Sequence, residues 1–290
     1  DVLTRYEGFG LDLIRSLESQ GTGVQQFHPE YSTGQFEVSV PHGSGVEPAD
    51  TTLVVRQTIR AVARAHGLDA SFAPVVFPDL VGNGCHLHFS LWDRDGRNLF
   101  AGGSSAHGLA REAEAFCAGI LAHLPALVAV TAPSAASYLR LQPHKWAGAF
   151  ATWGPENREA ALRFITGMVG SREAAANMEL KPVDAAANPY LALGAVIALG
   201  LAGLDGDLSL PEPTTDDPSE IPEDRWEAMG IRPLPRSLRE AIGELEGSTL
   251  LREAMGDLLY DSFLATRRGE LMAFDGLDPE AITRAHRWRY

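Results

Sequence analysis

The first 67 residues change from a helical to a strand-like hydrophobic pattern and back again. Between residues 6 and 18 apolar side chains recur every three or four positions, which predicts a helix followed by a glycine turn. Between residues 24 and 40 apolar and polar positions alternate around a Ser-Thr-Gly turn, which predicts a β-hairpin. A proline and acidic residues at 47–50 open a second predicted helix, which ends at Gly67.

The rest of the chain alternates strand-like segments with helices. Strands are predicted at 70–77, 85–92, 147–153, 159–165 and 178–181. Helices are predicted at about 105–130, at 190–204 and throughout 237–290, and the segment 205–235 is predicted to be a loop because it is rich in Pro, Asp and Glu. The strands look like antiparallel pairs separated by helices, and the sequence has no internal repeat. We therefore predict an α+β fold, with an antiparallel curved sheet flanked by helices, rather than a doubly wound parallel sheet.

Composition narrows the class of protein. The 290 residues are 45% hydrophobic and 21% charged, which is typical of a folded globular chain. A net charge of −14 argues against nucleic acid or an anionic membrane as partner. The two cysteines lie in apolar segments, so a reducing, cytoplasmic location without disulfides is expected. The most apolar run, 190–204, is shorter than the roughly 18 residues that suggest a membrane span.

The strand predicted at 85–92 carries the first candidate chemistry. With a side-chain period of two, His86, His88 and Ser90 share one face, and three apolar residues share the other. Two structural histidines are the alternative interpretation. The preceding Gly82-Asn-Gly84 segment favours a binding site, because glycines let the backbone approach a ligand closely.

Carboxylates and arginines recur at other points. Glu30 and Glu37 flank the hairpin turn, where two carboxylates on neighbouring strands can converge on one hard cation, although solvated surface charges are the alternative. Arginine binds carboxylate and phosphate through paired hydrogen bonds, and three arginines lie in largely apolar sequence: Arg140, Arg158 and Arg163. Surface ion pairing is their alternative role, with Glu156 and Glu159 as available partners.

A further pair, Glu179 and Lys181, shares one face of a short predicted strand. Together, acids, histidines and arginines spread over 150 residues indicate a site for metal-assisted phosphoryl transfer. In that chemistry the protein mainly positions groups and neutralises the charge on the transferred phosphoryl group.

Six segments then occur in an order that resembles the catalytic domain of the glutamine synthetase family. They are Gly34-Gln-Phe-Glu37, Ala65-His-Gly67, Gly84-Cys-His-Leu-His-Phe-Ser-Leu-Trp92, Ser137-Tyr-Leu-Arg-Leu141, Asn157-Arg158 with Ala161-Leu-Arg163, and Ala186-Ala-Asn-Pro-Tyr190. They span roughly residues 6–206, and an ordered set is more specific than any single match. The resemblance implies a glutamine synthetase/guanido kinase-like catalytic domain over 1–290, with a helical C-terminal part at about 237–290. It also implies a ligase that makes γ-glutamyl phosphate from glutamate and ATP and passes the glutamyl group to an amine.

The resemblance implies a role for each candidate residue. Two Mg²⁺ or Mn²⁺ ions would be bound by Glu30, Glu37, His86 and Glu179. ATP would contact His88, Ser90 and Arg163, and the catalytic arginines would be Arg140, which binds the α-carboxylate of glutamate beside Gly82, and Arg158, which stabilises the phosphoryl group. Lys181 stands where the family usually has an arginine that also contacts glutamate, so a point charge replaces a planar fork.

The sequence also departs from the family pattern. The family's Glu-x-Glu metal strand and its smaller N-terminal β-grasp domain would precede residue 1, so we expect a truncated catalytic domain that is poorly active alone. Trp146, in His144-Lys-Trp-Ala-Gly148, replaces the flap glutamate that helps bind ammonium, and Val81 replaces a usual asparagine. An indole can line an apolar or cation-stacking pocket. We therefore expect an organic amine or polyamine as acceptor, as in members resembling γ-glutamylpolyamine or γ-glutamylmonoamine synthetases.

Three other functions are alternatives to an amine-using ligase. An ammonia-using glutamine synthetase remains an alternative. A catalytically inactive member with a structural or regulatory role is disfavoured, because a scaffold needs no buried charges of both signs. A zinc hydrolase built on His86 and His88 is disfavoured, because the candidate site is rich in arginines. By the same resemblance, the intact protein is expected to form a ring-shaped homo-oligomer.

Overall fold

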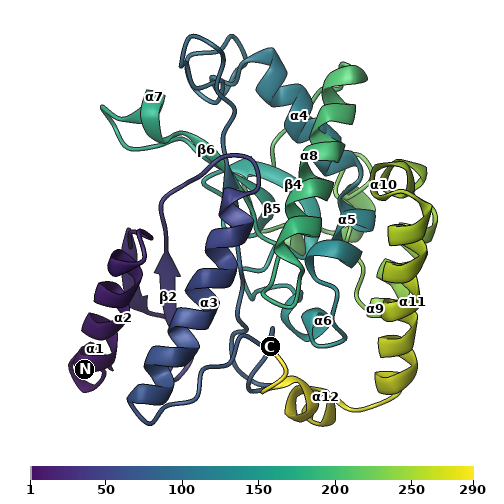
Figure 1. Cartoon of the computed structure of the whole chain (residues 1–290). Helices are drawn as coiled ribbons and strands as arrows, with labels where there is room; N and C mark the ends of the chain where they lie inside the picture. Colours follow the sequence, from purple (N-terminus) through teal and green to yellow (C-terminus); the bar gives the residue numbers. More distant parts are fainter. Residues whose placement is uncertain (1) are drawn as a thin grey trace.

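The computed structural model describes residues 2–290 and shows a helix-rich molecule around a small mixed sheet (Figure 1). Its N-terminal part consists of α1 (Val2–Arg5), α2 (Glu7–Ser19), β1 (Gln26–Pro29), β2 (Phe36–Ser39) and α3 (Glu47–Ala65). The two strands form an antiparallel hairpin, and α2 packs against α3. A small hydrophobic cluster joins these elements, with stacked Phe27 and Phe36 rings 5.2 Å apart between centroids.

The central sheet has four strands in the order β3-β6-β5-β4. Its strands are β3 (Leu87–Phe89), β4 (Phe150–Pro155), β5 (Ala160–Ile165) and β6 (Asn177–Leu180). The β6 strand pairs antiparallel with β3 and β5, whereas β4 pairs parallel with β5. In this register His88 of β3 and Arg163 of β5 both lie opposite Glu179 of β6. Three candidate site residues therefore form one row across the sheet.

Helices supply most of the main core. They are α4 (Arg111–Ala122), α5 (Leu124–Thr131), α6 (Ser137–Arg140), α7 (Arg172–Ala175), α8 (Pro189–Asp205), α9 (Leu238–Glu246), α10 (Thr249–Met255), α11 (Asp257–Phe274) and α12 (Pro279–His286). Two short 3₁₀ turns, η1 (Pro218–Glu220) and η2 (Glu223–Arg225), interrupt the loop between α8 and α9. The apolar face of β3, made of Leu87 and Phe89 and continued by Leu91, packs against the core, which leaves the opposite face for polar chemistry.

The α4 and α8 helices cross at very short range. A Cβ atom added to Gly119 of α4 would lie 2.3 Å from the Leu199 oxygen and 2.7 Å from the Gly203 nitrogen, and one added to Gly203 would lie 2.1 Å from the Ala115 oxygen. Such contacts are shorter than side chains tolerate, so glycine at both positions lets the two helices meet backbone to backbone. This crossing lies within the main hydrophobic core.

Most predicted elements are confirmed, and four predictions need correction. The helices near 6–18, 47–66 and 190–204, the hairpin and the helical C-terminal part are present. The segment 70–77 forms no strand, and the strand predicted at 85–92 is reduced to residues 87–89. The long helix predicted at 105–130 begins at Arg111 and divides at His123, where α4 and α5 bend by 75°. The strand pairing is not wholly antiparallel, because β4 and β5 run parallel.

Within residues 2–290, no single helix has the length and apolar character needed to cross a membrane. The bent pair α4 and α5 meets that test only when the two helices are taken together.

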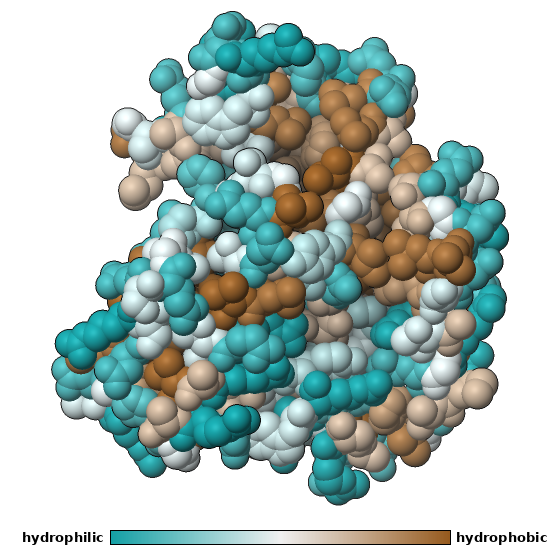
Figure 2. All heavy atoms as spheres, viewed as in Figure 1, coloured by the Kyte–Doolittle hydropathy of each residue, from teal (hydrophilic) through white to brown (hydrophobic). Residues whose placement is uncertain are grey.

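The surface is hollowed on one side. Figure 2 shows a notch between the part of the molecule that carries α7 and the part that carries α1 and α2, with hydrophobic residues along its inner wall and hydrophilic residues on its rim.

Candidate active site

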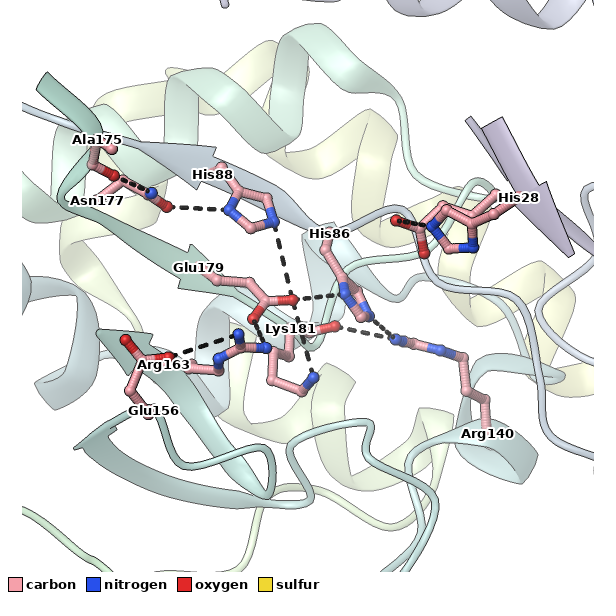
Figure 3. Close-up of polar contacts among 11 residues, drawn as sticks. His28, His86, His88, Arg140, Glu156, Arg163, Ala175, Asn177, Glu179 and Lys181 are labelled. Carbon is pink, nitrogen blue, oxygen red and sulfur yellow. Dashed lines mark hydrogen bonds and ion pairs between the residues drawn. The ribbon is translucent and has the colours of Figure 1, made fainter. Parts of the chain in front are cut away.

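Glu179, in the inner strand β6 of the sheet, is the centre of the candidate site (Figure 3). It is only 4% exposed. Its Oε1 lies 2.7 Å from His86 Nδ1, 3.8 Å from His88 Nε2 and 3.8 Å from Lys181 Nζ, and its Oε2 lies 3.2 Å from Arg163 Nη1. A buried carboxylate is stable only when it is paired in this way. Burial raises its pKa, but the hydrogen bond from His86 and the charges of nearby groups, including Lys181, outweigh burial and lower the pKa to about 2.

His86 connects Glu179 to Arg140. Its Nδ1 donates to Glu179, and its Nε2, 3.0 Å from Arg140 Nη2, accepts from the guanidinium. Burial lowers the pKa of His86 to about 4 despite the opposing effect of Glu179, so the imidazole is neutral near pH 7. A Cβ atom on Gly84 would lie 2.5 Å from His86 Nε2 and 2.8 Å from Arg140 Nη2. The glycine therefore makes room for this contact.

Arg140 is the last residue of α6 and is 3% exposed. Its Nη2 also donates to the Lys181 carbonyl oxygen at 3.0 Å, while its buried Nη1 has no hydrogen-bond partner among the described residues. Gly82 passes close to it, since a Cβ atom there would lie 3.0 Å from Arg140 Cγ and 2.3 Å from the Pro74 oxygen. An unsatisfied guanidinium nitrogen beside a glycine backbone is suited to bind a carboxylate.

The hairpin contributes a second acidic group. His28, Glu30 and Glu37 each offer a ligand atom, and these atoms lie within 4.8 Å of one another. His28 Nδ1 is 3.4 Å from Glu30, and His28 Nε2 is 3.7 Å from Glu37, which lies opposite it in the hairpin register. The sequence did not single out His28 as a candidate ligand. Its signal was the strand period of two, which places His28 and Glu30 on the same side of the chain.

Polar side chains tie the hairpin turn to the segment before β3. Ser32 Oγ donates to the Val81 carbonyl oxygen at 2.7 Å. Gln35 Nε2 donates to the Gly82 carbonyl oxygen at 3.0 Å and to Asn83 Oδ1 at 2.7 Å. These bonds fix the hairpin against the glycine segment that leads to His86. The predicted ligands thus fall into two groups, with Glu30 and Glu37 at the hairpin, and Glu179 of β6 with His86 directly before β3.

These two groups fit a hard divalent cation. The three carboxylates offer the oxygen ligands that Mg²⁺ and Mn²⁺ prefer, with the imidazole nitrogens as additional donors. In addition, the buried Oε2 of Glu179 faces Arg163 without a hydrogen bond of good geometry, so it keeps free acceptor capacity.

The residues predicted to contact ATP lie on both sides of Glu179, with His88 on β3 and Arg163 on β5. His88 Nδ1 is 3.0 Å from Asn177 Oδ1, and Ser90 Oγ accepts from Trp92 Nε1 at 2.9 Å. Arg163 pairs with Glu156 at 3.7 Å as well as with Glu179. Arg158, by contrast, is exposed in the turn between β4 and β5 and makes no hydrogen bond or ion pair with the rest of residues 2–290. The structure therefore does not join it to the Glu179 network.

Trp146 belongs to a loop with unusual backbone angles. The φ angles of His144 and Trp146 are 62° and 51°, in the left-handed region that non-glycine residues rarely adopt. His144 lies 3.2 Å from Asp217, and the Trp146 N–H donates to Glu159 at 3.3 Å. The Trp146 ring contacts Tyr31 of the hairpin turn, with centroids 4.7 Å apart. The loop and the hairpin thus meet through their aromatic side chains.

The sequence matches known proteins over nearly its whole length. A family model described as "Glutamine synthetase, catalytic domain" matches residues 2–285. The chain is 54% identical to the γ-glutamylpolyamine synthetase GlnA3 of Streptomyces coelicolor, over 96% of this chain and 60% of that protein. It is 37% identical to a glutamine synthetase of Halobacterium salinarum, over 81% of this chain and 51% of that protein.

Solved structures agree with the sequence matches. A "novel glutamine synthase homolog" superposes with a TM-score of 0.86 at 38% identity, covering 97% of this chain and 63% of that one. An ADP complex of GmaS superposes with a TM-score of 0.83 at 28% identity, covering 98% of this chain and 64% of that one. The chain therefore spans between 51% and 64% of the length of these four relatives. On the family match and these identities, the chain belongs to the glutamine synthetase family.

Proposed function

We propose that these residues form the catalytic part of an ATP-dependent ligase that joins the γ-carboxyl group of glutamate to an organic amine. The observation that carries the proposal is the buried Glu179, within 4 Å of two imidazoles, a lysine and an arginine. A concentration of buried charge of this kind is costly and marks functional sites. The 54% identity to a protein named γ-glutamylpolyamine synthetase supports the same conclusion.

In this proposal, glutamate lies between Arg140 and Lys181. The free Nη1 of Arg140 would bind the α-carboxylate, and the Gly82 backbone would lie beside the amino-acid end of the substrate. The ammonium of Lys181 would hold the γ-carboxylate. Burial lowers the pKa of Lys181, while the nearby Glu179 charge opposes that effect.

The reaction would proceed in two displacements. A γ-carboxylate oxygen of glutamate attacks the terminal phosphorus of ATP, and ADP leaves. The amine nitrogen then attacks the carbonyl carbon, phosphate leaves, and the nitrogen loses a proton. The exposed and unpaired Arg158 would swing to the phosphoryl group and neutralise its charge in both steps.

Metal and nucleotide sites complete the proposal. Glu30, Glu37, His86 and Glu179 would hold two Mg²⁺ or Mn²⁺ ions, and His28 joins this set as a further ligand. When bound, such ions neutralise phosphate charge during transfer. His88, Ser90 and Arg163 would contact ATP, and both His88 and Arg163 also lie beside the Glu179 carboxylate.

An organic amine is proposed as acceptor because of Trp146. Trp146 is 39% exposed and its ring contacts Tyr31 at a tilt, so the loop presents aromatic surface. Such a surface can contact alkyl chains and bind cations, but it cannot accept a proton from ammonium.

The test is phosphate release by the intact protein that carries these residues, with ATP, Mg²⁺, glutamate and one amine at a time. We expect phosphate release to depend on all four components and to be faster with putrescine or spermidine than with ammonium. Mass spectrometry should identify the γ-glutamyl amide. Faster release with ammonium would contradict the proposed acceptor, and no release with any amine would contradict the proposed ligase.

A further inference from the structure

Glu159, in the turn between β4 and β5, is a half-buried carboxylate without a counter-ion. Its Oε1 accepts only the Trp146 N–H, at 3.3 Å, and its Oε2 has no hydrogen-bond partner among residues 2–290. Glu156 and Glu159 are the ion-pair partners that the sequence offers to the arginines. Glu156 does pair with Arg163, but Glu159 has no cationic nitrogen within 4.0 Å in the described part of the chain.

The surroundings of Glu159 favour an added cation. Burial and the nearby Asp217 charge raise the pKa of Glu159, against the Trp146 N–H and the charges of Lys181 and His144. Asp217 itself is satisfied, because it accepts from Ser219 at 2.6 Å and lies 3.2 Å from His144. Asp217 therefore holds the loop in place, and Glu159 is the carboxylate left free.

Aromatic surface adjoins this carboxylate. The Trp146 backbone is bonded to Glu159, and the Trp146 ring lies 4.7 Å from the Tyr31 ring, at an interplanar angle of 41°. Trp146 and Tyr31 are 39% and 68% exposed, so both can be reached from solvent. Because the Trp146 main chain links the rings to the carboxylate, this part of the surface can hold an alkyl chain ending in an ammonium group.

We propose that Glu159 determines specificity for amines with a second positive charge. One nitrogen of a diamine or polyamine would attack the glutamyl group, the methylene chain would lie against Trp146 and Tyr31, and the distal ammonium would pair with Glu159. The inference rests on the proposed function. It adds that the preferred acceptor is a dication or a longer polyamine and not a simple alkylamine.

The position of Glu159 agrees with this assignment. It directly follows Arg158, the arginine proposed to neutralise the phosphoryl group, and it directly precedes β5, which carries Arg163. Its backbone N–H donates to Asn157 Oδ1 at 3.0 Å, which fixes the turn that carries both residues. A rigid turn is what a specificity residue requires, because a mobile carboxylate would select poorly between chain lengths.

The experiment compares putrescine with n-butylamine, which has the same carbon chain and only one amine, in the intact protein. For the Glu159→Gln variant we expect kcat/KM for putrescine to fall about tenfold, as on losing a hydrogen bond to a charged group. The value for n-butylamine should change less than twofold, and KM for glutamate and ATP should be unchanged. The Glu159→Asp variant, which keeps the charge, should retain most of the preference for putrescine.

Glu220→Gln is the matched control, because Glu220 is an exposed carboxylate in the same loop as Asp217. It should leave both amines unaffected, and unfolding midpoints should show that all variants are folded. Equal losses for putrescine and n-butylamine, or no loss in Glu159→Gln, would overturn the inference while leaving the ligase intact. A wild-type protein that releases no phosphate with any amine would overturn the proposed function itself.

Discussion

At the scale of single residues, Glu179 holds several charges together. Lys181 is 4% exposed, and the Arg163 side chain is 20% exposed, so neither cation is well hydrated. Replacing Glu179 with glutamine keeps the shape and removes the negative charge that both cations face. We expect Glu179→Gln to lower the free energy of unfolding by about 3 kcal/mol, because removing one partner of a buried pair leaves the other charge uncompensated. We also expect phosphate release by the intact protein to fall by roughly 100-fold.

Glu156→Gln is the control for Glu179→Gln. Glu156 also pairs with Arg163, at 3.7 Å, but its side chain is 52% exposed. Exposed pairs contribute at most about 1 kcal/mol, so this variant should unfold close to the wild type in urea. If both variants lost the same stability, the assignment of Glu179 as the central charge would be wrong.

The sequence predicts the positions of some of these residues and not of others, for physical reasons. A strand period of two placed His86, His88 and Ser90 on one face, and the structure confirms that the opposite face packs into the core. Pairing across strands is a long-range property, however. The sequence therefore could not show that Glu179 would lie opposite both His88 and Arg163. The sequence also could not show that Glu159 would have no ion pair within residues 2–290, because ion pairing depends on distances that sequence spacing does not determine.

At the scale of elements, the crossing of α4 and α8 gives a sharp stability test. Gly203 meets α4 at backbone range, where an added Cβ would lie 2.1 Å from the Ala115 oxygen. Gly194, in the same helix, has nothing within 4 Å of its added Cβ. We expect Gly203→Ala to destabilise the protein by about 3 kcal/mol, because the helices must move apart. Gly194→Ala should stabilise it by about 0.5–1 kcal/mol through helix propensity. Urea unfolding followed by circular dichroism measures both, and a stabilising Gly203→Ala would contradict the close crossing.

The helices and strands show which structural features a local hydrophobic pattern can predict. Helical periodicity and glycine or proline at the ends were enough to predict α2, α3 and α8. The division of the predicted 105–130 helix arises from a 75° bend at His123, and a buried apolar sequence on both sides of the bend gave no periodic signal for it. The segment 70–77 is partly buried but bends at several residues and pairs with no strand among residues 2–290, so its apolar pattern reflects burial and not a strand.

At the scale of the whole molecule, the C-terminal segment holds the backbone that leads to the candidate site. The Phe72 N–H donates to the Tyr290 carbonyl oxygen at 3.1 Å, and Arg287 Nε donates to the Val76 carbonyl oxygen at 3.0 Å. These bonds hold the segment 71–76, which runs into the glycines before β3. Glu270 of α11 also contacts this C-terminal part of the molecule, through His286. It accepts from the Ala135 N–H at 3.0 Å, two residues before α6 and its Arg140.

Glu270 makes the stability of this assembly depend on pH. His286 Nε2 and Arg267 Nη1 lie 3.2 Å and 3.1 Å from its carboxylate. Burial raises the pKa of Glu270, but these partners and the Ala135 N–H prevail and lower it from 4.5 to about 2. Between these two pH values the unfolded chain binds more protons than the folded chain. The stabilisation is therefore complete above pH 4.5 and is lost as the pH falls toward 2, and it amounts to about 3 kcal/mol.

The test compares the wild type with Glu270→Gln by urea unfolding at several pH values between 7 and 3. At pH 7 the variant should be less stable by about 3 kcal/mol, and the difference should shrink steadily below pH 4.5. Asp184, whose pKa is raised to about 6 mainly by burial and to a lesser extent by the Glu270 charge, affects stability with the opposite sign, and most of its contribution cancels in the difference. The control is Glu280→Gln on α12, where a side chain that is 81% exposed pairs with Arg284 only at 4.0 Å, so no difference is expected at any pH. A gap between wild type and Glu270→Gln that stayed constant from pH 7 to pH 3 would show that Glu270 acts through packing rather than through its charge.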